Sequence, residues 1–429
     1  MTPTKVVIPA AATTRHRRRL TSLPRLDSHL KGVDLVFSLG RHQPDHTGVL
    51  TCLWTARTIP FVSDTGSTVS VEVHEIMVGF ANFSKVEGMG SSPLYESLAS
   101  SVGGDPELAS VMLDAPLEQR RHTLYFAALH FLVLQNPDHP LAQWFPTVSP
   151  TPRQDSPEAE FRRFCRTFES EIRVLVAGQR TQTNEVGRCA VLHPALSWAF
   201  RRERAPISLV DVGCSAGLNL FPDRWRYDYS NGVGLGDQAS PVRVACQLRS
   251  SEPLPSDPFP AVVRRIGVDL NPVDIRDDTQ TRWLQACVFA DQPERFSRLG
   301  SALAAVRRDP ARIHRGDLLS VVPDLLAGWT GSGPICLTST WTLAYLDRAQ
   351  REQFRETLER FGRSLDLHLI MGEPPNVEWV DTPPGMPDEA TVWTHVRFGP
   401  GNVRTTFLGY SQPHGAWLSW KPQVDVVTA

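Results

Sequence analysis

Two glycines, Gly213 and Gly217, follow an apolar, β-branched run at residues 207–212. Glycine has no Cβ and adopts positive φ at little cost, so a ligand can approach the main chain closely there. A helix is expected from Leu218 onward, and the N–H groups at its start favour an anionic group. Asp211 could accept a hydrogen bond from a ligand ammonium. The pattern predicts a nucleotide or adenosyl-group site, and a strand-to-helix connection without a ligand is the alternative.

Two further carboxylates, Asp269 and Asp317, follow short strand-like segments downstream. In adenosylmethionine-dependent methyltransferases, a glycine-rich loop, an acid ending the next strand and an Asp after the following strand contact methionine, ribose and adenine, and the order here matches. The spacing does not, since that acid normally lies about 20 residues beyond the glycines. Residues 222–262 are therefore an insertion over the site, or the cofactor site has been rebuilt. Ser215 adds a side chain where many methyltransferases have glycine.

A second candidate site lies at residues 180–188, where Gln182, Asn184 and Glu185 cluster in an otherwise apolar region. If the segment begins a helix, Arg180, Asn184 and Arg188 share one face. Glu185 is then a candidate general base for an amine, and Arg180 a candidate to hold a carboxylate or sulfate. The alternative is a capping and salt-bridge cluster that docks a helical region onto the sheet.

Further candidates for substrate contact carry polar or aromatic side chains after the glycine-rich loop or after late strands. Arginine and tyrosine alternate behind the loop and could grip an anion while the rings cover apolar substrate, although such residues are as often buried structural links. The late-strand candidates lie at the edge where open α/β sheets bind ligands. These candidates are Asn219, Arg224, Tyr227, Tyr229, Trp341 and Glu373.

The first predicted turn contains a compact polar group, His42, Asp45 and His46. Most Pro-Asp turns are solvated structure. If the surrounding segment closes over the main pocket, Asp45 becomes a second candidate general base. No spacing in the chain supports a metal site, and His130, beside Phe126 and Phe131, is expected to be a core histidine.

The elements that must position these residues predict an α/β fold with a Rossmann-like, adenosylmethionine methyltransferase-like sheet. We expect a small β-rich segment at residues 1–80, an α-helical lobe at 92–205 and the α/β domain at 206–429. The β-rich segment rests on strand-like runs at residues 33–39, 48–54 and 67–74. Helices are predicted from apolar spacing at residues 94–102, 117–134, 158–176 and 347–361.

Composition favours a soluble enzyme. The formal net charge of −2 argues against general nucleic-acid binding, and no apolar stretch is long enough to suggest a membrane span. Seven scattered cysteines without a C-x-x-C pair favour reduced thiols in the cytoplasm rather than a disulfide framework or zinc site.

Several long motifs resemble the bacterial DUF2332 family from about residue 92 to near the C-terminus. They are RTQTNEVGRC at 180–189, GCSAGLN at 213–219, DRWRYDY at 223–229, GVDLNP at 267–272 and DQPER at 291–295. The resemblance implies a methyltransferase-like fold. One branch of that family belongs to the biosynthesis of azinomycin-type and vazabitide-type natural products.

For that branch, the resemblance implies aziridine ring closure on an amino acid tethered to an amino-group carrier protein, with a sulfate ester as leaving group. It also implies a small partner subunit, for which residues 1–80 are a candidate, either as a fused subunit or as a natural extension. Ring closure needs no cofactor. An adenosylmethionine-dependent methyltransferase and a non-catalytic binding module are the alternatives.

Overall fold

The computed structural model describes residues 70–87, 92–203, 205–377, 385–400 and 402–428. The chain divides into two compact units, Met1–Glu75 and Ile76–Ala429. The second unit contains the sheet and the helices described below, except for the first five residues of the helix at Val71–Asn82. The expected strands at residues 33–39 and 48–54 lie outside the described residues, as do His42, Asp45 and His46.

The expected strand at residues 67–74 is wrong for its described part, because Val71–Asn82 forms helix α1. Val73, Ile76 and Phe80 recur at spacings of three and four residues, which is a helical period and not a strand period. The β-branched residues of this stretch therefore lie on a helix.

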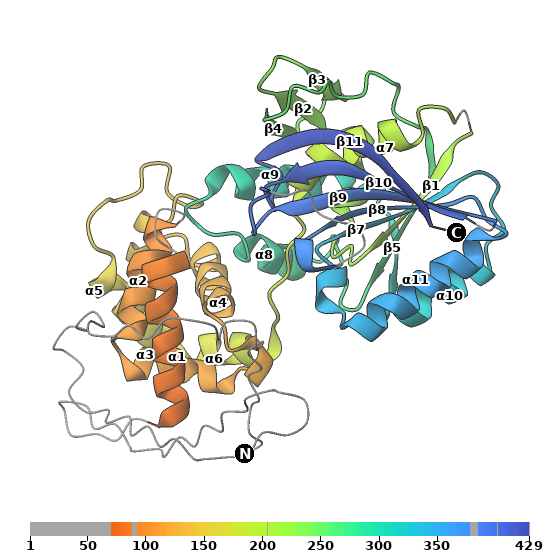
Figure 1. Cartoon of the computed structure of the whole chain (residues 1–429). Coiled ribbons are helices and arrows are strands. Elements are labelled where there is room, and N and C mark those ends of the chain that lie inside the picture. Colours follow the sequence, from red (N-terminus) through yellow and green to blue (C-terminus); the bar gives the residue numbers. More distant parts are fainter. Residues whose placement is uncertain (1–69, 88–91, 204, 378–384, 401, 429) are drawn as a thin grey trace, which may run out of the picture. The chain divides into compact units, whose positions relative to one another are not determined.

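The helices predicted before the sheet are present. The prediction at 94–102 corresponds to α2 (Pro93–Gly103), that at 117–134 to a 3-10 turn and α4 (His122–Gln135), and that at 158–176 to two helices, α5 (Glu158–Thr167) and α6 (Glu169–Gly178) (Figure 1). Two further helices, α3 (Pro106–Ser110) and α7 (Cys189–Ala199), were not predicted. Helix α4 is buried along most of its length, which explains its continuous apolar sequence.

The described residues form one eleven-stranded mixed sheet with the order β3-β2-β4-β11-β10-β9-β8-β7-β1-β5-β6. This confirms the α/β class. The strands are β1 (Ile207–Val212), β2 (Arg226–Tyr229), β3 (Gly234–Gly236), β4 (Arg243–Leu248), β5 (Val262–Asp269), β6 (Arg312–Arg315), β7 (Ile335–Thr340), β8 (Leu367–Glu373), β9 (Thr391–Gly399), β10 (Asn402–Ser411) and β11 (Trp417–Thr428).

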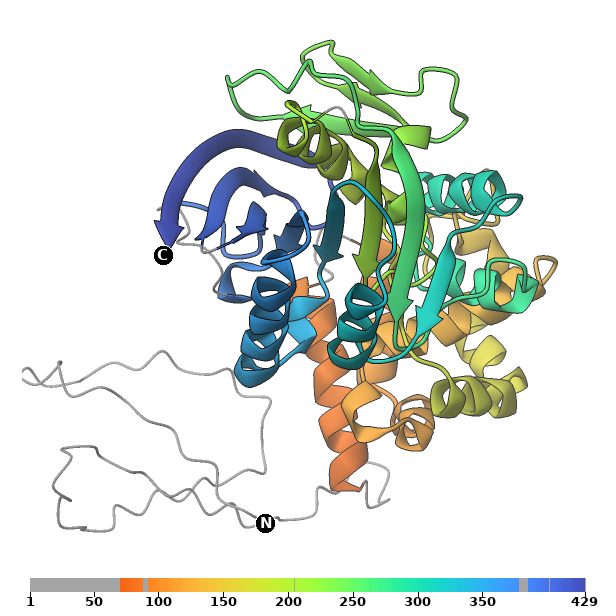
Figure 2. The same cartoon turned by 90° about the vertical axis from the view of Figure 1, so that its right-hand side faces the viewer.

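Strands β6, β5, β1, β7 and β8 run parallel, and Figure 2 shows β1, β5 and β6 side by side with their carboxyl ends at one edge. Strand β1 is buried at every position, as expected for a central parallel strand. Its neighbours are β5 and β7, so the chain reverses direction across the sheet beside β1. Such a switch point is where open α/β sheets bind ligands.

Two apolar cores cover the two faces of this sheet. Helices α10 (Leu318–Ala327) and α11 (Arg348–Gly362) pack on the face to which Val210 and Val212 point (Figure 1). Helices α7, α8 (Asp278–Ala286) and α9 (Pro293–Val306) pack with Leu209 on the other face.

Within the described residues, no helix is long and apolar enough to cross a membrane.

The helix expected from Leu218 does not form. The chain makes two 3-10 turns, Leu218–Leu220 and Pro222–Arg224, before entering β2. Pro222 has no N–H to donate to the Leu218 carbonyl, so one of the first α-helical hydrogen bonds cannot be made. The glycine-rich loop therefore leads into compact turns.

Residues 222–262 form the extra strands β2, β3 and β4, which extend the sheet beyond β11 at the edge opposite β5 and β6. This inserted segment explains the long sequence distance between the glycines and Asp269. Because β5 pairs with β1, with Asp211 opposite Gly267, Asp269 still lies beside the glycine-rich loop.

Candidate functional site

A cavity of ≈ 720 Å³ opens at the carboxyl ends of β1, β5, β6 and β7. This volume suits a small-molecule ligand. The lining includes six of the predicted site residues, namely Gln182, Gly213, Ser215, Asp269, Asp317 and Trp341. It also includes residues that sequence reasoning had not proposed as ligand contacts, among them Arg188, Thr340, Thr342, Tyr345 and His414. No residue of the 222–262 segment lines it.

Protein atoms occupy the space beside the two glycines of the glycine-rich loop. Gly213 has φ +73°, as expected for a glycine that turns the chain. A Cβ at this position would overlap the side chain of Thr342, and one at Gly217 would face Ile313 Cδ1 at 3.3 Å. The expectation that Gly217 opens the main chain to a ligand is therefore corrected, whereas Gly213 lines the cavity and also lets the neighbouring loop pack closely.

Ser215 (φ 52°) and Trp341 (φ 59°) are the two non-glycine residues with positive φ in the described part of the chain. Both line the cavity. Ser215 Oγ donates to Gln182 Oε1 at 3.1 Å, and Trp341 Nε1 donates to Thr391 Oγ1 at 2.7 Å. Backbone strain of this kind concentrates at functional sites.

Glu373, predicted to contact substrate, lies beneath the loop that follows β7 and does not line the cavity. Its Oε1 accepts hydrogen bonds from Ser339 Oγ (2.6 Å) and from the Thr342 and Leu343 N–H groups (3.0 and 3.1 Å). Burial raises the pKa of Glu373. The residue therefore supports the loop that carries Trp341 and Thr342.

The two strand-end carboxylates lie in the cavity wall. Asp269 Oδ2 accepts the Ser215 N–H at 2.8 Å, and its Oδ1 accepts the Asn271 N–H at 2.7 Å. Asp317 caps α10, and its Oδ1 accepts the Leu319 N–H at 2.8 Å. Oδ2 of Asp317 accepts no hydrogen bond from the described residues, so this exposed carboxylate is available to a ligand.

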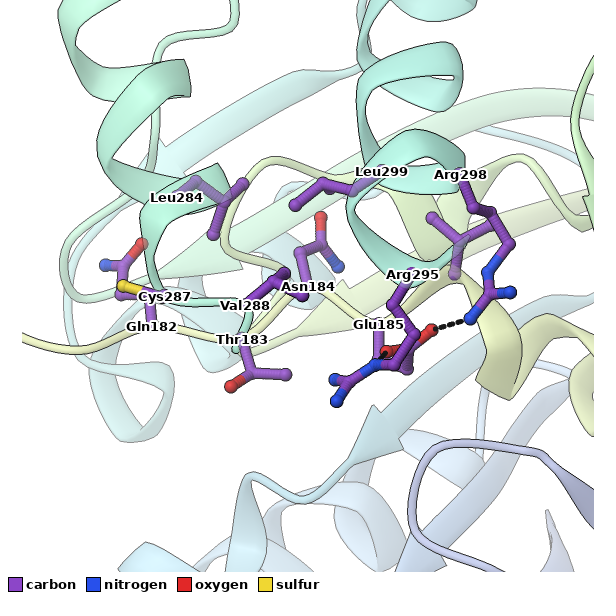
Figure 3. Close-up of a pocket in the computed structure, with 11 residues that line it drawn as sticks. Gln182, Thr183, Asn184, Glu185, Leu284, Cys287, Val288, Arg295, Arg298 and Leu299 are labelled. Carbon is purple, nitrogen blue, oxygen red and sulfur yellow. Dashed lines mark hydrogen bonds and ion pairs between the residues drawn. The ribbon is translucent and has the colours of Figure 1, made fainter. Parts of the chain in front are cut away.

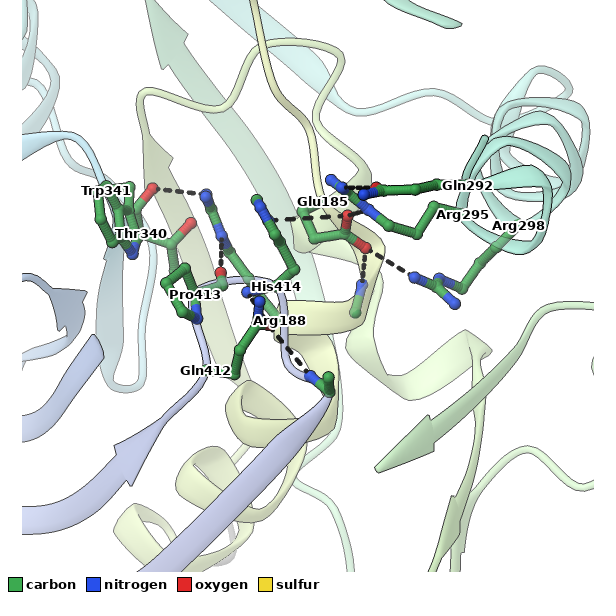
Figure 4. Close-up of polar contacts among 12 residues, drawn as sticks. Glu185, Arg188, Gln292, Arg295, Arg298, Thr340, Trp341, Gln412, Pro413 and His414 are labelled. Carbon is green, nitrogen blue, oxygen red and sulfur yellow. Dashed lines mark hydrogen bonds and ion pairs between the residues drawn. The ribbon is translucent and has the colours of Figure 1, made fainter. Parts of the chain in front are cut away.

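Arg188 also lines the cavity. Its side chain is 6% exposed, and it donates from Nη1 to the Thr340 carbonyl and from Nε to the Pro413 carbonyl, both at 3.0 Å (Figure 4). No carboxylate of the described residues forms an ion pair with it. Burial lowers the pKa of Arg188. The guanidinium remains charged, because an arginine pKa lies far above neutral pH.

Glu185 does not line this cavity and instead occupies a small pocket of ≈ 20 Å³ together with Arg295 and Arg298 (Figure 3). Its carboxylate accepts hydrogen bonds from Arg295 Nε (2.7 Å), Arg298 Nη2 (3.0 Å) and the Gly187 N–H (2.8 Å). Burial alone would raise the pKa of Glu185, but Arg295 and Arg298 outweigh it and lower the pKa to about 2. These contacts disfavour the general-base role expected for Glu185 and match the alternative salt-bridge cluster.

The helix considered for residues 180–188 is also corrected. Residues 179–185 have no regular secondary structure, and Val186–Arg188 forms one 3-10 turn before α7. Gln182 Nε2 donates to the Asn271 carbonyl, and Asn184 Oδ1 accepts the Leu218 N–H at 3.0 Å. Side chains that bind the main chain of other loops thus hold this segment across the sheet edge.

His414 reaches the cavity from the turn between β10 and β11. Its Nδ1 lies 4.0 Å from Glu185 Oε2 and has no hydrogen-bond partner among the described residues. Burial and the nearby Arg295 lower the pKa of His414 to about 3, so the imidazole is neutral at physiological pH. No motif signalled this residue, because its position depends on how a distant hairpin packs.

Other predicted contacts lie outside the cavity lining. Arg180 is 54% exposed and its Nη2 lies 3.7 Å from Glu118 Oε1, while Arg224 pairs with Asp309 at 2.7 Å. The hydroxyls of Tyr227 and Tyr229 donate to the Pro222 and Ala190 carbonyls, both at 2.6 Å, inside the core. For these four residues the structure favours structural roles.

Asp211 and Asn219 are buried beneath the loop. Asp211 Oδ1 accepts the Thr338 hydroxyl at 2.8 Å, and burial raises the pKa of Asp211 to about 7. Asn219 contacts Cys189 Sγ and Thr340 Oγ1, both at 3.4 Å. Neither side chain lines the cavity, so the expectation that Asp211 meets a ligand ammonium is corrected. In the described residues, no group of His, Cys, Asp and Glu is arranged to hold a metal ion.

Comparison with known protein families matches residues 79–420 to DUF2332, described as an uncharacterized protein conserved in bacteria. The chain belongs to this family, and the match begins ahead of residue 92, where the motif resemblance had been placed. No curated protein matches. A solved structure described as "Conversion of a Disulfide Bond into a Thioacetal Group during Echinomycin Biosynthesis" is 12% identical, with a TM-score of 0.24 over 61% of this chain and 88% of that one. A likeness this weak does not inform function.

Proposed function

We propose that this protein is a natural-product biosynthetic enzyme that closes an aziridine ring. In this reaction the amine of a carrier-bound diamino acid displaces a sulfate ester on the same molecule. One observation carries the proposal, namely a single cavity at the sheet's switch point that is lined by a buried cation, Arg188, and by two carboxylates, Asp269 and Asp317. Such a lining suits a ligand that bears both an anionic group and an amine.

For this reaction the protein mainly has to position the amine against the carbon that carries the sulfate. The ammonium first gives one proton to a carboxylate or to water, and the lone pair of the neutral amine then forms a bond to the carbon that carries the sulfate. The carbon–oxygen bond breaks, and sulfate leaves with that electron pair. The ring nitrogen then loses one proton to a carboxylate or to water. Holding amine and carbon at attack distance is worth several kcal/mol of barrier, on the order of 7 or more in favourable cases. A fixed cationic donor stabilises the charge that develops on the leaving oxygen.

Asp317 is the carboxylate that we assign to the amine, with Asp269 beside it. Asp317 lines the cavity and has one oxygen without a hydrogen bond from the described residues. Glu185 takes no proton in this scheme, because its oxygens are held by Arg295, Arg298 and the Gly187 N–H. Asp45 remains a predicted second base and lies outside the described residues.

The methyltransferase alternative requires adenosylmethionine in the same cavity. The residues present do not fit it, since the side chain of Thr342 fills the space beside Gly213 at the methionine end and both oxygens of Asp269, the acid expected to contact the ribose, accept main-chain N–H groups. A non-catalytic binding module would keep the cavity but would tolerate replacement of its carboxylates.

The carrier protein and a small partner subunit, for which residues 1–80 are a candidate, remain proposals that follow from the proposed reaction. A reducing, cytoplasmic compartment is proposed on the same footing. All six cysteines in the described residues are free, and most are buried without a partner cysteine, as is usual for proteins kept in a reducing compartment.

The decisive measurement is the mass of a carrier-bound, sulfated diamino acid after incubation with the full chain, with and without adenosylmethionine. The expected result is loss of sulfate without added cofactor, with a cyclic product identified by NMR. Asp317→Asn should lower turnover about 100-fold or more, the usual range for losing one acid–base group. Asp309→Asn, an exposed carboxylate paired with Arg224 outside the cavity, is the control.

Each other outcome selects a different function. Transfer of a methyl group only when adenosylmethionine is present would establish the methyltransferase. Binding of the substrate without any change in mass, unaffected by Asp317→Asn and Asp269→Asn, would establish a binding module.

A further inference from the structure

The charges around Arg188 do not balance within the protein. Arg188, Arg295 and Arg298 gather around one carboxylate, Glu185, which forms ion pairs with Arg295 and Arg298 and lies 4.0 Å from the neutral imidazole of His414 (Figure 4). Glu185 and Glu373 both favour the charged form of Arg188, yet each carboxylate is engaged by donors of its own. The guanidinium of Arg188 is thus left with main-chain carbonyls as partners.

A buried charge without a counter-charge is costly, and proteins keep one where a ligand completes the pair. Arg188 is more than nine-tenths buried and lines the cavity. Its Nη2 donates no hydrogen bond to the described residues. We infer that Arg188 is the anion-binding subsite of this cavity and that it takes the oxyanion of the ligand, a sulfate ester or a carboxylate.

The orientation of Arg188 is fixed in advance. The Pro413 carbonyl holds Nε from the β10–β11 turn, and the Thr340 carbonyl holds Nη1 from the end of β7. Two of the guanidinium nitrogens are therefore anchored to separate elements, and Nη2 remains for a ligand. A donor held in this way needs little reorganisation when an oxyanion arrives.

The subsite narrows the substrate class of the proposed function, on which this inference rests. Arg188 would hold the anionic group while Asp269 and Asp317, which also line the cavity, face the amine. A ligand with only an ammonium would leave Arg188 without a counter-charge, and a ligand with only an oxyanion would leave Asp269 and Asp317 without one. The expected substrates are therefore amino-acid-like molecules with an ammonium and at least one oxyanion.

Calorimetric titration of the full chain with O-sulfo-L-serine, L-serine and ethanolamine tests the subsite without any ring closure. The wild type should bind O-sulfo-L-serine at least about tenfold more tightly than ethanolamine, the usual worth of a hydrogen bond to a charged group. Arg188→Met should remove that difference, and Arg188→Lys, which keeps the charge but loses the fork, should weaken binding less. Arg180→Met, an exposed arginine outside the cavity, should bind as the wild type does.

The same titrations show whether Arg188 binds the sulfate or the carboxylate of the ligand. If Arg188→Met weakens O-sulfo-L-serine but not L-serine, Arg188 holds the sulfate; if it weakens both equally, it holds the carboxylate. Equal wild-type affinity for ethanolamine and O-sulfo-L-serine would overturn the subsite, even where Arg188→Met does not fold. So would an Arg188→Met protein that folds and keeps wild-type affinity, or a wild type that binds none of the probes. Binding that depends on Arg188, without sulfate loss in the turnover assay, would refute the ring closure and leave the subsite standing.

Discussion

Two charged residues of one short motif, Glu185 and Arg188, have opposite environments. Glu185 is neutralised by Arg295 and Arg298 inside a pocket too small for a ligand. Arg188 lies three residues further on, has only carbonyl partners and lines the large cavity. Residue type alone therefore does not identify the functional group here, since the number of partners around each charge decides its role.

Glu185→Gln should destabilise the fold, and the loss should depend on pH. The lowered pKa of Glu185, about 2 against an ordinary 4.5, means that its stabilisation is fully present above pH 4.5 and is lost as pH falls toward 2. The wild type should exceed the variant by on the order of 2–4 kcal/mol at pH 6, and the gap should shrink with acid. Urea unfolding at a series of pH values measures this.

Glu118→Gln is the control for that series. Glu118 is exposed and pairs with Arg180 at 3.7 Å, so its loss should change the unfolding free energy by less than about 0.5 kcal/mol. A gap between wild type and Glu185→Gln that stays constant from pH 6 to pH 3 would contradict the charged, paired state of Glu185.

At the scale of elements, the cavity is built by loops that support one another at the carboxyl edge of the sheet. The loop after β1 packs against Thr342 in the loop after β7, and that second loop is in turn held by Glu373 at the end of β8. The absence of a side chain at Gly213 is what lets the first two loops meet. The strained residues Ser215 and Trp341 lie in these same loops.

Gly213→Ala should therefore cost more than an alanine at an open position with the same backbone. Gly213 (φ +73°) and Gly232 (φ +84°) are both left-handed, but no atom lies within 4 Å of a Cβ built at Gly232. Gly232→Ala should cost about 1–2 kcal/mol from conformation alone. Gly213→Ala should add about 1–3 kcal/mol from the overlap with Thr342, as measured by chemical unfolding.

A second substitution separates the cost of the overlap with Thr342 from the cost of the left-handed backbone at Gly213. Thr342→Ala in the Gly213→Ala background should recover part of the extra cost, since the Oγ1 and Cγ2 atoms nearest the new Cβ are then gone. Equal costs for Gly213→Ala and Gly232→Ala would show that the two loops do not pack as described.

At the scale of the whole second unit, His130 links the helical region to the sheet domain. It lies on α4, and its Nδ1 contacts the Ala286 and Val288 carbonyls at 3.1 and 3.0 Å at the end of α8. Its Nε2 lies 2.8 Å from Thr147 Oγ1. The side chain is fully buried, so the expectation of a core histidine is confirmed. This contact makes the α4–α8 interface sensitive to acid.

Burial lowers the pKa of His130 from 6.5 to about 4. Stability that depends on neutral His130 is present above pH 6.5 and is lost as pH falls through 4, by on the order of 2–4 kcal/mol. His193 and His414 also have lowered pKa values, so the wild-type slope alone is not diagnostic. His130→Gln should unfold with a shallower dependence on pH between 6.5 and 4 in calorimetric scans, and an unchanged slope would contradict the buried neutral state.

The sequence by itself determined the central sheet and the approximate place of the site. A continuous apolar run predicted β1, helical spacing predicted α2, α4 and α11, and Gln182, Gly213, Ser215, Asp269, Asp317 and Trp341 all line the cavity. These signals are local, because consecutive residues determine both whether a strand is buried and which loop follows its carboxyl end.

Only the tertiary structure decided which charges are free to meet a ligand. Glu185 is paired by residues more than a hundred positions away, and Arg188 is anchored by carbonyls from β7 and from the β10–β11 turn. Thr342 fills the space that Gly213 leaves, and the chain makes 3-10 turns at Leu218–Leu220 and Pro222–Arg224 in place of the helix expected after the loop. The number of partners that a charged side chain has depends on contacts between segments far apart in the sequence. Secondary-structure propensity and residue spacing carry information only about residues that are close along the chain.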